Sequence, residues 1–132
     1  MGLRLRELPA SDVIEETIAF DYKYAYRFNF GTRVWSELVT GTTWTPPVSD
    51  DVTALFWTTN FYQVSGNTLF WVCNYNTTDP IRYYNGTAWT AITPTLNAAG
   101  DTLQNARILV AYQGRMVALN VIQNEGVFPA IT

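Results

Sequence analysis

The side chains best suited to acid–base chemistry in this sequence are two neighbouring carboxylates, Asp50 and Asp51. Glycosidases use two carboxyl groups that flank a pocket, so a sialidase-like enzyme is one interpretation. Adjacent strand residues point to opposite faces, however, and aspartates beside a proline-containing loop commonly cap turns. The chain has no histidine, which excludes a histidine-activated nucleophile and a Cys/His zinc site. No nucleotide motif occurs either, and we expect no catalytic, metal-binding or cofactor-binding residues and therefore no enzyme.

The single cysteine, Cys73, lies in the apolar segment 70–73. One cysteine cannot form an intramolecular disulfide. A reactive thiol needs a nearby cation that lowers its pKa, and no basic residue is close to Cys73 in the sequence. We expect Cys73 to behave as a small buried hydrophobic residue.

Tryptophan side chains offer a second kind of chemistry, because sugar rings dock on aromatic faces. The chain has five: Trp35, Trp44, Trp57, Trp71 and Trp89. Trp35 and Trp89 follow two similar turns and would suit repeated lectin pockets, although such residues more often pack one sheet against the next. Trp44, beside a proline pair, is the best surface candidate and could equally be a plug that closes a sheet edge. A carbohydrate-binding β module, with a glycan as its partner, is therefore an alternative function.

These side chains must be positioned by β-strands. Aromatic residues occupy every second position over one segment: Tyr22, Tyr24, Tyr26, Phe28 and Phe30. Alternation with period two predicts a strand that carries all five rings on one face. We expect this face to be covered, and Lys23 and Arg27 on the opposite face to be more exposed.

Two hairpin signatures occur twice, in the same order. The segment Asn29–Trp35 returns in shorter form as Asn85–Trp89, and the hairpin at Gly66 returns at Gly114, each about 50 residues later. A period of ~40–50 residues with two hairpins per unit is typical of propeller blades. The sequence therefore predicts an all-β fold of two repeated four-stranded antiparallel units that resemble propeller blades.

We place both units in a single β domain that spans residues 1–132, with unit one at about 18–75 and unit two at about 80–121. The turn residues at 76–80 are taken as the break between them. The hairpin turns at Gly66 and Gly86 require positive φ. A two-residue turn at Gly66 would place Val64 opposite Leu69 and Tyr62 opposite Trp71.

The composition limits the possible partners. Charged residues make up 14% of the chain, the net charge is −3, and the few basic residues are scattered, so we expect no nucleic-acid binding. No run of ~20 apolar residues suggests a membrane span. Two units are short for a closed propeller, which favours a fragment of a longer protein or assembly with other chains. The apolar arms 108–111 and 116–119 of the last hairpin are expected to be covered by another chain or by further blades.

Three segments, read together, carry a resemblance: Met1–Arg4 with Ile18–Tyr26, Asp79–Trp89, and Ala106–Asn120. They resemble the propeller-like virion structural proteins of tailed bacteriophages, the type that includes short-tail nozzle and hub proteins. Proteins of this group are longer and continue beyond the loop that matches Glu125–Pro129. The resemblance implies a structural component of the phage particle, located in the virion, that acts by assembly and without cofactor chemistry. Its implied partners are other virion proteins or copies of itself.

Overall fold

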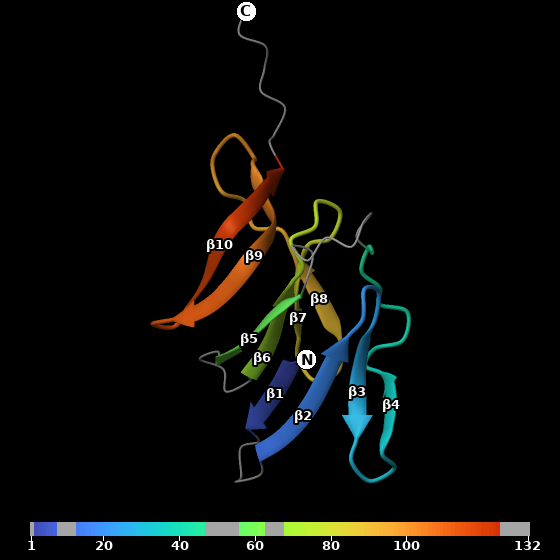
Figure 1. Ribbon diagram of the computed structural model, residues 1–132. Helices are drawn as coiled ribbons and strands as arrows, with labels where there is room; N and C mark the ends of the chain where they lie inside the picture. Colours follow the sequence, from blue (N-terminus) through green and yellow to red (C-terminus); the bar gives the residue numbers. More distant parts are fainter. Residues whose placement is uncertain (1, 8–12, 47–55, 63–67, 125–132) are drawn as a thin grey trace, which may run out of the picture.

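The computed structural model describes residues 2–7, 13–46, 56–62 and 68–124 (Figure 1). Within these residues the chain forms ten strands, all paired antiparallel, and no helix. They are β1 (Gly2–Glu7), β2 (Val13–Phe20), β3 (Ala25–Asn29), β4 (Val34–Glu37), β5 (Trp57–Tyr62), β6 (Thr68–Cys73), β7 (Ile81–Tyr84), β8 (Trp89–Ile92), β9 (Thr102–Tyr112) and β10 (Arg115–Asn124). The prediction of an all-β antiparallel fold is confirmed. In the described part of the chain no helix could span a membrane.

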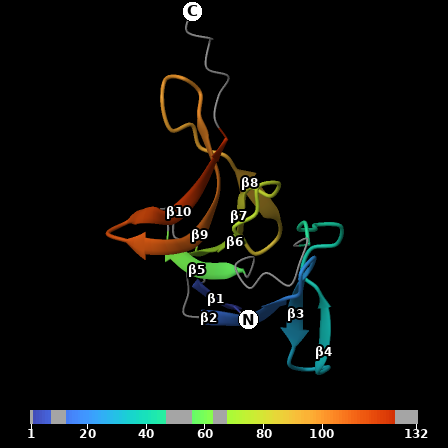
Figure 2. The same cartoon turned by 45° about the horizontal axis from the view of Figure 1, so that its top comes forward.

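The strands form three sheets that lie one on another. Strands β1–β4 form the first four-stranded sheet and β5–β8 the second, each in sequence order, and β9 and β10 form a two-stranded hairpin. Figures 1 and 2 show the second sheet between the first sheet and the hairpin. The second sheet is therefore the only one of the three with a neighbour on both faces among the described residues.

Strand β6 illustrates this arrangement, because its alternate residues enter two different cores. Phe70 and Val72 belong to the core shared with the first sheet. Leu69, Trp71 and Cys73 belong to the core shared with the hairpin. A strand covered on both faces is apolar at successive positions, which explains the continuous apolar segment in the sequence.

The sheets do not coincide with the predicted units at 18–75 and 80–121. Strands β6 and β7 pair with each other across residues 76–80, the segment that was expected to separate the units. There the side-chain Oδ1 of Asn76 accepts a hydrogen bond from the backbone N–H of Thr78, at 2.7 Å. Such a turn reverses the chain equally well within one sheet or between two, so turn residues alone do not identify the boundary.

The prediction that Tyr22–Phe28 form a covered face is met only in part within the described chain, because Tyr24, Tyr26 and Phe28 are half-buried but the core lies on the opposite side of the strand. Tyr22 is 55% exposed, and β3 begins only at Ala25, which is 3% exposed and lies in the core. Ile18 pairs with Arg27 and Phe20 pairs with Ala25, so the core side of the sheet carries the odd-numbered residues of β3. Alternation separates the two faces of a strand, whereas the residues on neighbouring strands decide which face is buried.

Lys23 and Arg27 are exposed, as predicted. Arg27 lies at the margin of the core side, where its Nη1 is 3.3 Å from Oε1 of Glu16. A guanidinium can extend its apolar stem along a sheet while its charged end stays in water. Exposure of the two cations was therefore compatible with either orientation of the aromatic residues.

Of the two turns predicted to have a glycine at positive φ, only the turn at Gly86 lies within the described residues. Gly86 adopts φ of 103°, as predicted, and Gly66 lies outside the described residues. In the β5–β6 pair, Leu69 lies opposite Phe61 and Trp71 opposite Thr59, which contradicts the predicted partners Val64 and Tyr62. The described pairing ends at Tyr62 and Thr68, and residues 63–67 lie outside the described residues.

We expect Gly86→Ala to lower the free energy of unfolding by about 1 kcal/mol or more, because a Cβ atom is strained at its positive φ. Urea denaturation measures the change. Thr87→Ala, at an exposed position of the same turn, is the matched control and should change stability by less than ~0.5 kcal/mol. Equal stability of wild type and Gly86→Ala would contradict the turn assignment.

Candidate functional site

The β3–β4 hairpin presents a cluster of aromatic rings to solvent. Phe28 lies directly opposite Trp35, with ring centroids 5.1 Å apart, and Phe30 packs edge to face on Phe28 at 5.0 Å. Phe30 is 66% exposed and Trp35 is 42% exposed. Tyr24 and Tyr26 extend the cluster, with their centroids 6.3 Å apart. These five residues, Tyr24, Tyr26, Phe28, Phe30 and Trp35, are termed the aromatic face.

Two polar turns hold the ends of the aromatic face. At one end, Oδ1 of Asn29 accepts hydrogen bonds from the backbone N–H groups of Gly31 and Thr32, at 2.9 and 3.0 Å. At the other end, Oδ1 of Asp21 accepts hydrogen bonds from the backbone N–H groups of Lys23 and Tyr24, both at 2.6 Å. Side-chain acceptors of this kind fix a turn where no strand partner is present.

The Asp21 carboxylate also receives the hydroxyl of Tyr26, whose Oη lies 2.7 Å from Oδ2. Burial alone would raise the pKa of Asp21, but the hydrogen bonds from Tyr24, Lys23 and Tyr26 outweigh it and lower that pKa. The same hydrogen bond to Asp21 raises the pKa of Tyr26. Asp21 is therefore held in its charged form beside the aromatic face.

The β7–β8 hairpin contains a similar aromatic pair in a buried position. Tyr84 lies opposite Trp89, with ring centroids 5.3 Å apart. Oδ1 of Asn85 accepts hydrogen bonds from two backbone N–H groups of the turn, both at 2.9 Å, as Asn29 does in the first sheet. Tyr84 is only 2% exposed, because the first sheet covers it. One kind of hairpin is therefore covered in the second sheet and open in the first.

Trp44 is buried, so it is not the surface platform that the sequence favoured. It is 2% exposed and fills the space between the first two sheets. Its ring meets those of Phe20, Phe56 and Trp89 edge to face, with centroids 5.2 to 5.6 Å apart. The guanidinium of Arg82 lies 4.8 Å from the indole centroid on the same ring.

The remaining tryptophans divide between surface and interior. Trp57 is 44% exposed, and its Nε1 donates a hydrogen bond to the carbonyl oxygen of Leu109, at 2.8 Å. Trp71 is 8% exposed, and Trp89 is partly buried against the first core. Trp35 is thus the exposed tryptophan that belongs to a larger aromatic cluster.

The β9–β10 hairpin has one covered and one open side. Leu109, Met116 and Ala118 pack into the core shared with the second sheet. On the opposite side, Val110 pairs with Val117 and Ile108 pairs with Leu119. The residues of this side, the half-buried Ile108 and the exposed Val110, Tyr112, Val117 and Leu119, are termed the aliphatic face. Tyr112 is 61% exposed and Leu119 is 47% exposed. One side of the hairpin is therefore covered by the second sheet of the same chain, where cover by another chain or by further blades was expected, and the other side is open among the described residues.

A buried polar cluster ties the hairpin to the second sheet. Asn105 of β9 is fully buried, and its Nδ2 donates to Oδ1 of Asn74 at 2.7 Å and to the carbonyl oxygen of Asp79 at 2.8 Å. The carboxylate of Asp79 in turn accepts hydrogen bonds from Asn74 and from the backbone N–H of Thr45, both at 2.8 Å. These groups satisfy one another, so the cluster has a structural role.

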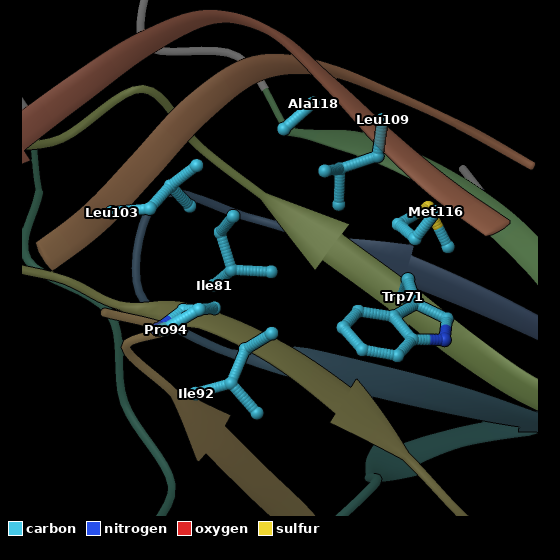
Figure 3. A pocket seen from close by; sticks show the side chains of 8 residues that line it. All are labelled: Trp71, Ile81, Ile92, Pro94, Leu103, Leu109, Met116 and Ala118. Atoms are coloured by element: carbon cyan, nitrogen blue, oxygen red, sulfur yellow. The ribbon is translucent and has the colours of Figure 1, made fainter. Parts of the chain in front are cut away.

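A cavity of about 140 Å³ lies between the second sheet and the hairpin (Figure 3). Its lining is apolar: Trp71, Ile81, Ile92, Pro94, Leu103, Leu109, Met116 and Ala118. Ile81 and Ile92 are paired residues of β7 and β8, whereas β9 packs chiefly against β5 and β6. Two strands cannot cover the whole face of a four-stranded sheet, and the cavity lies where that cover ends.

The other candidate residues offer no site in the described structure. Asp50 and Asp51 lie outside the described residues. Cys73 is buried, as predicted, and burial raises the pKa of its thiol to about 12. Among the described residues, no three His, Cys, Asp or Glu side chains come together as metal ligands.

No protein family matches this chain, and no curated protein or solved structure matches it either.

We expect Ala118→Val to raise the free energy of unfolding by about 1 kcal/mol, because its added methyl groups enter the cavity and valine suits a strand. Thermal and urea denaturation measure the change. Ala106→Val is the matched control, since Ala106 is fully buried and does not line the cavity. That substitution should destabilise the chain by overpacking. Loss of stability in Ala118→Val would contradict an open cavity.

A second prediction concerns pH. The pKa of Asp21 is lowered in the folded chain, so its contribution to stability is present above its unfolded pKa and disappears as pH falls through the folded value. Wild type should lose more stability than Asp21→Asn as the pH drops below about 4. Urea denaturation at neutral and acid pH measures both chains. Parallel pH profiles would show that the carboxylate does not support the turn.

Proposed function

We propose that this chain is a structural component of a bacteriophage particle, a propeller-like part of the tail that acts through assembly contacts. The observation that carries the proposal is the open Phe28–Trp35 pair of the first sheet, because the second sheet has a buried aromatic pair, Tyr84–Trp89, in the corresponding two strands. The turn of the first hairpin lies one residue pair further from its aromatic pair, and in both hairpins an asparagine side chain accepts hydrogen bonds from the turn. A hairpin that is covered in one sheet and open in the other is suited to contact with a further sheet.

In this proposal the sheets β1–β4 and β5–β8 are two blade-like units. Both are meanders of four antiparallel strands. Ala25 and Ile81 begin the third strand of each unit, and both are buried on the side that faces the following layer. In this proposal the third strands of the two units correspond, the boundary lies between β4 and β5, and the β9–β10 hairpin belongs to a third unit.

The assignment to a phage tail rests on the resemblance of three segments, including Asp79–Trp89 and Ala106–Asn120, to propeller-like virion proteins. In the structure the first of these two segments contains the buried aromatic hairpin, and the second contains most of the β9–β10 hairpin with its aliphatic face. The resemblance therefore includes residues that would form contacts between sheets. A virion location and other virion proteins as neighbours follow from the same proposal.

The test is to purify particles made from the genome that encodes this chain and to quantify their proteins by mass spectrometry. The chain should be present in a fixed number of copies per particle and should remain after high-salt washing. A non-structural protein of similar abundance in the lysate is the control for contamination. Absence of the chain from intact particles would overturn the proposal.

A carbohydrate-binding module is the second candidate, favoured by the exposed rings of Phe30 and Trp35. Tryptophan fluorescence, measured against a set of glycans, distinguishes the two. The assembly proposal predicts no saturable quenching. Saturable quenching that Trp35→Ala abolishes, and that Trp57→Ala at another exposed site retains, would establish the lectin instead.

A further inference from the structure

We propose that the aliphatic face of one copy of this chain packs against the aromatic face of a second copy, in a head-to-tail contact. The inference rests on the proposed assembly function and names its partner as a second copy. Its basis is the way in which the three layers of one chain already contact each other.

The contact between the first two sheets joins two different kinds of face. The first sheet contributes the side that holds Ile18, Ala25 and Leu38, together with Phe20, whose ring stacks on that of Phe70. The second sheet contributes the side that holds the Tyr84–Trp89 pair. The first layer therefore meets the second through the side that carries Ala25 on one partner and the side that carries the Tyr84–Trp89 hairpin on the other.

The contact between the second sheet and the hairpin uses the sides of the layers in the same order. The second sheet now contributes its opposite side, with Trp71 and Ile81, and the hairpin contributes Leu109 and Met116. Ile81 begins β7 as Ala25 begins β3, so each sheet uses the corresponding side to contact the layer that follows it. The stack therefore has a direction.

This direction determines which faces remain open. The first sheet has no described layer before it, and its open side is the aromatic face, with Phe28 and Trp35 where Tyr84 and Trp89 lie in the second sheet. The hairpin has no described layer after it, and its open side is the aliphatic face. The next contact in the same order places the aliphatic face of one copy on the aromatic face of another.

The charges at the two faces agree with this pairing. Arg115 lies opposite Tyr112 and is exposed at the edge of the aliphatic face. The aromatic face carries two carboxylates, Glu37 opposite Tyr26 and Asp21 at the Tyr26 hydroxyl, and one cation, Lys23, over the ring of Tyr24. A head-to-tail contact brings a cation and an anion to the same interface, whereas a contact between two identical faces would bring like charges together.

A head-to-tail contact uses two different surfaces, so each can be removed separately. Trp35→Asp places a charge in the aromatic face, and Val117→Asp places one in the aliphatic face. Leu96→Asp is the matched control, because Leu96 is 43% exposed in the loop between β8 and β9 and belongs to neither face. Light scattering coupled to size exclusion measures the mass, and circular dichroism verifies folding.

We expect wild type and Leu96→Asp to exceed the 14.9 kDa mass of one chain, and each face variant alone to be a monomer. An equimolar mixture of the two face variants should form a one-to-one dimer, because Trp35→Asp keeps the aliphatic face and Val117→Asp keeps the aromatic face. A contact between identical faces would instead leave one variant dimeric by itself.

Three results would overturn the inference: monomeric wild type at millimolar concentration, face variants that assemble as wild type does, or a mixture that remains monomeric. Monomeric wild type that is still found in purified particles would leave the structural function intact, with a different virion protein as the neighbour. Phe30→Ser and Leu119→Ser, at more exposed positions of the same faces, replace either charged variant that does not fold.

Discussion

The structure depends on the burial of β6 on both faces. A strand with one solvent-exposed face needs only one packed layer to cover its apolar residues. Strand β6 needs two such layers, because it has Phe70 and Val72 on one face and Leu69 and Trp71 on the other. The first sheet and the β9–β10 hairpin meet that requirement, so neither can be removed without exposing apolar surface of the central sheet. The order of the three layers therefore depends more on the two apolar faces of β6 than on the turns that connect the other strands.

Polar groups then fix how the layers sit on the central sheet. Asn105 bridges the hairpin to Asn74 and to the backbone of Asp79, and the Asp79 carboxylate reaches Thr45 in the loop that also carries Trp44. Hydrophobic contact is non-directional, whereas a buried amide must find its partners at defined positions. The Asn105 cluster therefore gives the stack a definite register, and Trp44 fills the space that remains between the first two sheets.

The sequence predicted the strands well and their environment less well. Period-two alternation and the Asn85-Gly86 turn are local signals, so the all-β fold and the positive φ of Gly86 followed from short segments. Which face of β3 is buried depends on Ile18 and Phe20 of the neighbouring strand. The pairing of β6 with β7 likewise depends on residues that no turn motif encodes. Local sequence patterns therefore identified the alternating aromatic residues but could not predict that they lie on the side of β3 opposite the core.

Because the aromatic residues of β3 lie on the side opposite the core, they do not fill the core as the alternation suggested. Buried rings at Tyr26 and Phe28 would only have filled a core, whereas rings on an outer sheet face cost free energy in water unless something covers them. Natural monomers seldom leave such surface open, and the described part of this chain has two such faces, at opposite ends of one stack. The buried Tyr84–Trp89 pair shows what kind of layer covers such a hairpin, because the same chain supplies that layer. The proposed head-to-tail contact would cover both open faces with layers of the kinds that already pack against each other within one chain.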